Sequence, residues 1–243
     1  MSAMSPAGHS VQASPAVGPA SRAARIDRVL GFIVEAAAGA LVLADIAVLL
    51  AGVVARFAFH RPLVWSDELA SMLFIWLAML GAVVALRRGE HMRMTALVSR
   101  QAPARQQLLE AISVCASLAF LAMAAWPAWE YASEERFITT PALEISNAWR
   151  AAALPCGIAL MMLFSVLRLF KDADWRTGTK AFAAVAIVIG AFALGRGVFE
   201  DLGRYNLLIF FVGVVGASVF SGIPIAFAFG LGTIGYLELG TDT

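Results

Sequence analysis

The chain has 243 residues, of which 60% are hydrophobic and only 14% are charged, and its mean hydropathy is +0.80. This composition excludes an ordinary soluble domain and indicates an integral membrane protein. The formal net charge of +1 gives no reason to expect a nucleic-acid partner. The two cysteines, Cys115 and Cys156, lie inside apolar runs, so we expect small core residues and neither a disulfide framework nor a metal-thiolate site.

The beginning of the chain is rich in Ala, Ser, Pro and Gly, and we predict that residues 1–24 form a disordered cytoplasmic tail. A cleaved signal peptide would place its basic residues before a short apolar core. Here Arg22, Arg25 and Arg28 instead follow the Ala-, Ser-, Pro- and Gly-rich residues 1–21 and precede a long apolar run. We therefore interpret the run over residues 29–55 as an uncleaved first membrane span.

Three further apolar runs cover residues 65–86, 111–129 and 151–167. A helix rises 1.5 Å per residue, so a run of about twenty residues crosses about 30 Å of hydrocarbon. We therefore predict an all-α fold in which residues 25–175 form an integral membrane four-helix bundle. Lysine and arginine collect before the first span, between the second and third, and after the fourth, which predicts that these segments and the N-terminus are cytoplasmic.

The second span begins with polar residues. Ser66 is placed to cap the helix, and Asp67 and Glu68 in its first turn face the positive end of the helix macrodipole, an effect of about 0.3–1 kcal/mol each. The same two carboxylates could also order the preceding loop by pairing with Arg56 or Arg61. The two interpretations are compatible, and the sequence leaves both open.

Two acidic residues lie inside the first span. Asp45 is near its middle, and an intramembrane carboxylate is a functional hypothesis by default because it costs a few kcal/mol to place there. It could be protonated, pair with Arg56 three turns along the same face, or contact a partner subunit, and a transport role is the alternative to these structural ones. Glu35 lies nearer the cytoplasmic surface, where we expect it to be solvated.

Residues 55–94 carry polar, aromatic and glycine positions at fixed spacing. An Arg ends the first span, a Trp, a hydroxyl residue and an acidic pair open the second, and a Trp, a Gly and an Arg-Gly-Glu-His exit follow. This pattern resembles the small membrane subunit of tripartite ATP-independent periplasmic (TRAP) transporters, the DctQ type. The residues that carry the resemblance are Arg56, Trp65, Ser66, Asp67, Glu68, Trp76, Gly81, Arg88, Gly89, Glu90 and His91.

The resemblance implies a multi-pass subunit of a secondary transporter in the bacterial inner membrane. Its partners would be a large membrane subunit that binds substrate and sodium, and a periplasmic binding protein that delivers an organic acid such as a dicarboxylate or a sugar acid. The small subunit would act as a scaffold, and Asp67 and Glu68 would contribute to the platform where the binding protein docks. The alternative is a stand-alone membrane anchoring or interaction protein without a transport role.

The chain continues beyond a plain small subunit. Residues 176–204 contain a fifth apolar run, which we predict to be a linking transmembrane helix. Residues 205–243 resemble the beginning of the large TRAP subunit, the DctM type, in a helix break at Gly222 and Pro224 and in the glycine-rich run that follows. We therefore expect a fused small-plus-large subunit that is cut off before the substrate and sodium sites, so that this chain alone transports nothing.

The remaining polar and aromatic residues suit ordinary roles. Trp65 and Trp76 are expected to anchor at the membrane interface, and the segment from Arg105 is amphipathic enough to lie on the membrane surface. His91 has no second histidine three or four residues away, so we expect no metal site, and the lack of a cofactor or catalytic motif argues against an enzyme. The basic residues that set the orientation are also placed to contact anionic membrane lipids, and they are Arg87, Arg93, Arg100 and Arg105.

Overall fold

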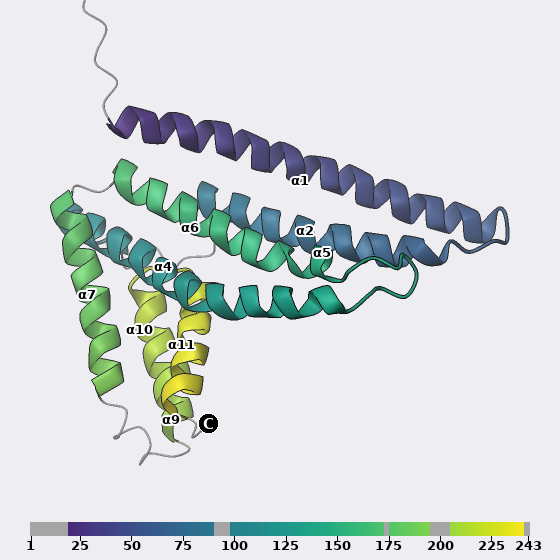
Figure 1. Cartoon of the computed structure of the whole chain (residues 1–243). Coiled ribbons are helices and arrows are strands. Elements are labelled where there is room, and N and C mark those ends of the chain that lie inside the picture. Colours follow the sequence, from purple (N-terminus) through teal and green to yellow (C-terminus); the bar gives the residue numbers. More distant parts are fainter. Residues whose placement is uncertain (1–18, 90–97, 173–174, 195–204, 241–243) are drawn as a thin grey trace, which may run out of the picture.

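The computed structural model describes residues 19–89, 98–172, 175–194 and 205–240. Within these residues the chain is helical, and β-structure is limited to one isolated bridge between Thr139 and Ser146. Four long helices run beside one another, and a C-terminal set of helices leaves them at a steep angle (Figure 1). The predicted all-α fold is confirmed.

The four long helices correspond to the predicted membrane spans. They are α1 (Pro19–Phe57), α2 (Val64–Arg88), α4 (Pro103–Glu134) and α6 (Ala153–Asp172), and the single-turn helix α5 (Ala148–Ala151) precedes α6. Four helices in the described part of the chain are long and apolar enough to cross a membrane, as predicted.

Two helix boundaries differ from the prediction. Helix α1 begins at Pro19, so residues 19–24 of the predicted tail are helical, while residues 1–18 lie outside the described residues. The segment from Arg105 is not a separate surface helix, because it forms the first turns of α4. Pro103 stands at the start of that helix, where its missing N–H costs no intrahelical hydrogen bond.

The core lies where α2, α4 and α6 meet, around Val83, Leu121 and Phe164. Helix α1 packs mainly against α2, and large side chains on its other face, such as Phe32 and Leu43, are exposed, as expected of a lipid-facing surface. Lipid tails are as apolar as leucine, so membrane helices associate through close packing of small residues. Alanine supplies much of the buried surface, at Ala70, Ala111, Ala116, Ala128, Ala151 and Ala153.

The two cysteines take different positions. Cys115 on α4 is buried, which confirms the prediction for this residue. Cys156 on α6 is exposed, so the prediction that it is a core residue is wrong. The run around Cys156 is apolar on all sides, and such a run does not reveal which face of the helix meets the core.

The C-terminal set begins with α7 (Trp175–Leu194), which packs against α4. A continuous helical stretch follows, made of α9 (Tyr205–Leu208), the π-helical turn η2 (Ile209–Val214) and α10 (Val215–Phe220). Helix α11 (Ile225–Gly240) then packs back against η2 and α10 and also contacts α4.

The break between α10 and α11 is tied to the bundle. Gly222 has φ +87°, in the left-handed region that favours glycine, and Pro224 immediately precedes α11. The Ser113 hydroxyl on α4 donates a hydrogen bond to the Gly222 carbonyl at 3.1 Å. A Cβ atom at Gly230 on α11 would overlap the ring of Phe120 on α4, so glycine at this position allows the two helices to approach closely.

Candidate functional site

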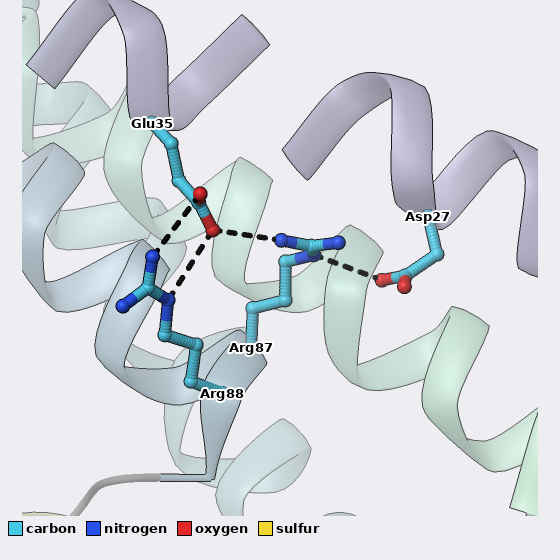
Figure 2. A network of polar contacts seen from close by, with 4 residues as sticks. All are labelled: Asp27, Glu35, Arg87 and Arg88. Carbon is cyan, nitrogen blue, oxygen red and sulfur yellow. Dashed lines mark hydrogen bonds and ion pairs between the residues drawn. The ribbon is translucent and has the colours of Figure 1, made fainter. Parts of the chain in front are cut away.

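At one end of the bundle, which we call the arginine end, two arginines of α2 meet two carboxylates of α1 (Figure 2). Arg87 Nε donates to Asp27 Oδ1 at 3.3 Å, and Arg87 Nη1 donates to Glu35 Oε1 at 2.9 Å. Arg88 Nε also donates to Glu35 Oε1 at 3.3 Å, and its Nη2 lies 3.1 Å from Glu35 Oε2. These four residues, the arginine network, join α1 to α2.

Arg87 is the most enclosed member of this network, with a side chain that is 20% exposed, against 49% for Arg88. Its guanidinium carbon lies 5.8 Å from the centroid of the Phe164 ring on α6, within the range of a cation–π contact. Gly31 on α1 makes room for it, because a Cβ atom at that position would overlap the guanidinium group. Arg87 of α2 therefore contacts both α1 and α6.

The arginine network corrects two expectations. Glu35 is not simply solvated, because it accepts hydrogen bonds from both arginines. Arg87 is not only a signal of membrane orientation, because two carboxylates hold it. The charge bias of a loop says which side of the membrane it takes, and it does not say which residues pair. The available signal was the eight-residue spacing of Asp27 and Glu35, which places them two turns apart on similar faces of α1.

The exit from α2 is described as far as Gly89. This residue has φ 71° and closes the helix, with its N–H directed to the carbonyls of Ala85 and Leu86. The left-handed conformation explains why glycine stands at this point of the motif. Glu90, His91 and Arg93 lie outside the described residues.

At the opposite end of the bundle, which we call the loop end, Glu68 ties α2 to the connection between α4 and α5. Glu68 Oε2 accepts a hydrogen bond from the Ala142 N–H at 2.7 Å, across 74 residues of sequence. We call this connection the 138–147 loop. The contact fixes the loop against the N-terminal part of α2.

The 138–147 loop also holds its own shape. The Thr140 N–H donates to the Ile145 carbonyl and the Asn147 N–H donates to the Ile138 carbonyl, each at 2.8 Å. The Asn147 side-chain amide donates to the Glu135 carboxylate at the end of α4. With these bonds the loop is a defined surface, and sequence reasoning missed it because its pairings follow no helical or strand periodicity.

Two further contacts lie near the loop end. The indole N–H of Trp76 on α2 donates to the Trp149 carbonyl on α5 at 2.8 Å. Arg56 Nη2 lies 3.6 Å from Asp67 Oδ2, with side chains 58% and 72% exposed, so this pair contributes little to stability. The two adjacent carboxylates therefore divide their roles: Asp67 meets Arg56, and Glu68 reaches the 138–147 loop.

Ser66 does not cap α2, which corrects the prediction. The helix begins at Val64 with Leu63 in the capping position, and the buried Ser66 hydroxyl donates to the Leu63 carbonyl at 2.7 Å. A Cβ atom at Gly52 of α1 would lie 2.7 Å from the Ser66 oxygen. Ser66 thus marks a close approach of α1 and α2, and the sequence signal misplaced the helix start by about one turn.

Asp45 does not pair with Arg56, because Arg56 meets Asp67. Asp45 Oδ1 is buried and accepts no hydrogen bond from the described residues. Along α1 this carboxyl lies between the level of Gly31, opposite Arg87, and that of Gly52, opposite Ser66. Among the described residues, no group pairs with this carboxyl oxygen.

The other motif positions are at the surface. Trp65 is partly exposed, and Gly81 is exposed with open space where a Cβ atom would lie, so the structure gives no packing reason for this glycine. Arg100 and Arg105, beside the start of α4, are also exposed. The sequence did not single out Arg168 on α6 or the buried Ser113, which line a cavity beside the arginine network together with Ser117 and Ser165.

Long apolar helices tied at both ends by polar contacts define a multi-pass helical membrane protein. A family model described as the DctQ component of tripartite ATP-independent periplasmic transporters matches residues 45–174, more than half of the chain. The chain belongs to this family, whose members are components of transporters.

Curated relatives include two sialic acid TRAP transporter proteins. The permease protein SiaT of Haemophilus influenzae is 28% identical over 156 residues, which cover 64% of this chain and 25% of the relative. The small permease protein SiaQ of Vibrio cholerae is 26% identical over 146 residues, which cover 60% of this chain and 84% of the relative. The match thus spans about a quarter of the first relative and most of the second.

Proposed function

We propose that this chain provides the scaffolding small-subunit part of a TRAP-type transporter, which braces a larger membrane subunit while that subunit moves an organic acid. The observation that carries the proposal is the pair of ties at the two ends of α2. Arg87 connects it to α1 and α6 at the arginine end, and Glu68 connects it to the 138–147 loop at the loop end. A brace needs such fixed distances between helices, because a moving partner must push against a body that keeps its shape.

The transport step itself is assigned to the larger subunit. Asp45 is the one carboxylate near the middle of a long span in the described part of the chain, and a single ionisable group does not make a binding site for an ion and a charged substrate. Transport by this chain alone is therefore not expected. The proposed substrates are sugar acids or dicarboxylates, with sialic acid as the first compound to test because two relatives are named for it. Sodium is the proposed coupling ion.

The larger subunit is proposed to begin within this same chain, with α7 as the link and the helices after residue 205 as its first elements. The glycine-rich α11 and the break before it support this proposal, and so does the similarity to SiaT, which is about four times longer than the matched part. If the chain continues or associates in this way, the bundle and the larger subunit share the surface of α4 that α7 and α11 contact.

The N-terminus is proposed to be cytoplasmic in an inner membrane, which places the arginine end inside and the loop end outside. Exposed aromatic residues near the loop end, including Trp129 and Trp149, suit a membrane–water interface. Asp67 and the 138–147 loop then face the periplasm, where a substrate-binding protein would dock. Arg100 and Arg105 face the cytoplasmic leaflet, where they would meet anionic lipids.

The test is substrate uptake by cells. In the bacterium that encodes the chain, deletion of its coding sequence should abolish sodium-dependent uptake of radiolabelled sialic acid or of a C4-dicarboxylate, and a plasmid copy should restore it. The purified chain in liposomes should take up neither compound. Unchanged uptake of both compounds after deletion would contradict the transporter role and favour an anchoring protein.

A further inference from the structure

A polar cavity of about 250 Å³ lies beside the arginine network, between α2, α4 and α6 and next to the break before α11. Three arginines, Arg87, Arg88 and Arg168, line it together with one carboxylate, Asp27. Glu35, which lies outside the lining, neutralises a second arginine. Within the described part of the chain, the lining of the cavity therefore has more basic than acidic side chains.

The arginines are held in place before any ligand binds. Asp27 and Glu35 together engage two of the five N–H groups of Arg87, and the Phe164 ring lies beside the guanidinium carbon. The remaining N–H groups form part of the planar fork that suits a phosphate group. A donor fixed by its neighbours loses little conformational entropy on binding, which favours affinity.

The rest of the polar lining comes from buried serines of two helices. Ser113 and Ser117 on α4 give their hydroxyl protons to backbone carbonyls, while Ser165 on α6 lines the cavity at 4% exposure. About 10–15 Å³ is enough for one water molecule on this scale, so the space is many times larger than a single water requires. Guanidinium groups cannot coordinate a cation, and a polar lining does not suit an acyl chain. The fitting ligand is an anion with several acceptor oxygens.

The position of the cavity favours a lipid over a free ion. It lies at the ends of α2 and α6, the depth at which phospholipid head groups surround a membrane helix. An apolar cavity of about 510 Å³ is lined by the residues next in sequence, Ile112 beside Ser113 and Ile223 beside Pro224. An acyl chain would therefore find an apolar surface on the same helices.

We propose that this cavity binds the phosphate group of an anionic phospholipid, with Arg87, Arg88 and Arg168 as the phosphate-binding residues. The bound lipid would contact both the bundle and the break before α11, and so hold the C-terminal helices to the bundle. The proposal differs from a general attraction of Arg100 and Arg105 to the membrane surface, because those residues do not line the cavity. It does not depend on the transporter role and needs only that the chain lies in a membrane.

The test is native mass spectrometry of the full chain, delipidated in mild detergent and titrated with phosphatidylglycerol. We expect one tightly bound lipid per chain, and an affinity at least about tenfold lower for phosphatidylcholine, whose head group adds a positive charge. Arg168→Gln should weaken phosphatidylglycerol binding about tenfold, because a charge-assisted hydrogen bond is lost. The matched control Arg105→Gln removes the same charge from an exposed position outside the cavity and should bind as the wild type does.

A second variant covers the case in which Arg168→Gln does not fold. Ser165→Leu fills the cavity and leaves all charges in place, and it should weaken the same binding step. Circular dichroism without lipid identifies the folded variants. Equal affinity in the wild type and every folded cavity variant would overturn the proposal. It would also be overturned if millimolar inorganic phosphate displaced the lipid and bound alone, since the site would then belong to a free anion.

Discussion

Replacing Gly31 with alanine disturbs the arginine network without removing any of its charges. The new Cβ atom would overlap the Arg87 guanidinium, which is the flexible end of its side chain and would be displaced. Displacement breaks the bond to Asp27, a charged pair whose side chains are 20% and 23% exposed, at a cost of roughly 1–2 kcal/mol. Loss of the Phe164 contact adds about 0.5–1 kcal/mol.

Gly39→Ala is the matched control on the same helix, because nothing lies within 4 Å of a Cβ atom there. Both variants gain the same helix propensity of about 1 kcal/mol, so the comparison isolates the displaced arginine. For a chain of this size, 1 kcal/mol corresponds to about 2–4 °C in Tm, so the summed cost of about 1.5–3 kcal/mol gives a difference of roughly 3–12 °C between the variants.

The assay is thermal unfolding of the purified variants in one detergent, followed by circular dichroism. Gly31→Ala should unfold at the lower temperature. In an Arg87→Ala background the difference in Tm between the two glycine variants should vanish, because the side chain that the new Cβ atom would overlap is absent. Equal Tm values in the wild-type background, or a difference that persists without Arg87, would refute the role assigned to the network.

Three further outcomes are expected. Glu68→Ala should speed amide hydrogen exchange in the 138–147 loop about tenfold, whereas Asp67→Asn should leave the exchange rate unchanged. Equal exchange rates in the two variants would contradict the contact between Glu68 of α2 and the loop. Trp76→Phe should lower the free energy of unfolding by about 0.5–1.5 kcal/mol, as measured by denaturant titration, because its bond to α5 is lost. In the folded, detergent-solubilised protein N-ethylmaleimide should label Cys156 faster than Cys115, and equal labelling rates by mass spectrometry would contradict the assigned faces.

Hydropathy and charge were enough to predict the fold class and the four long helices. A membrane span must form its backbone hydrogen bonds within itself, and it must be about twenty residues long. Local backbone geometry explains the glycine at position 89 of the motif, because a helix that ends in the left-handed conformation favours glycine there. The start of α2 was missed by about one turn, because Ser66 resembles a cap in sequence while its neighbours already form the helix.

The contacts between helices could not be predicted from the sequence. Glu68 and Ala142 are 74 residues apart, and Arg87 meets Asp27 across 60 residues, so no local periodicity links either pair. The exposed face of Cys156 was likewise hidden, because the run around this residue is apolar on all sides. The structure therefore adds the pairing of the charges, and that pairing supports both the brace and the proposed phosphate cavity.

The central claim is that this chain works as part of a larger membrane complex. The most direct measurement is the intact mass of the N-terminally tagged chain, purified from its native membranes in mild detergent. We predict a mass well above 25.8 kDa, either in one longer polypeptide or with a second hydrophobic subunit bound in stoichiometric amount. A lone 25.8 kDa species without a membrane partner would contradict the scaffolding role.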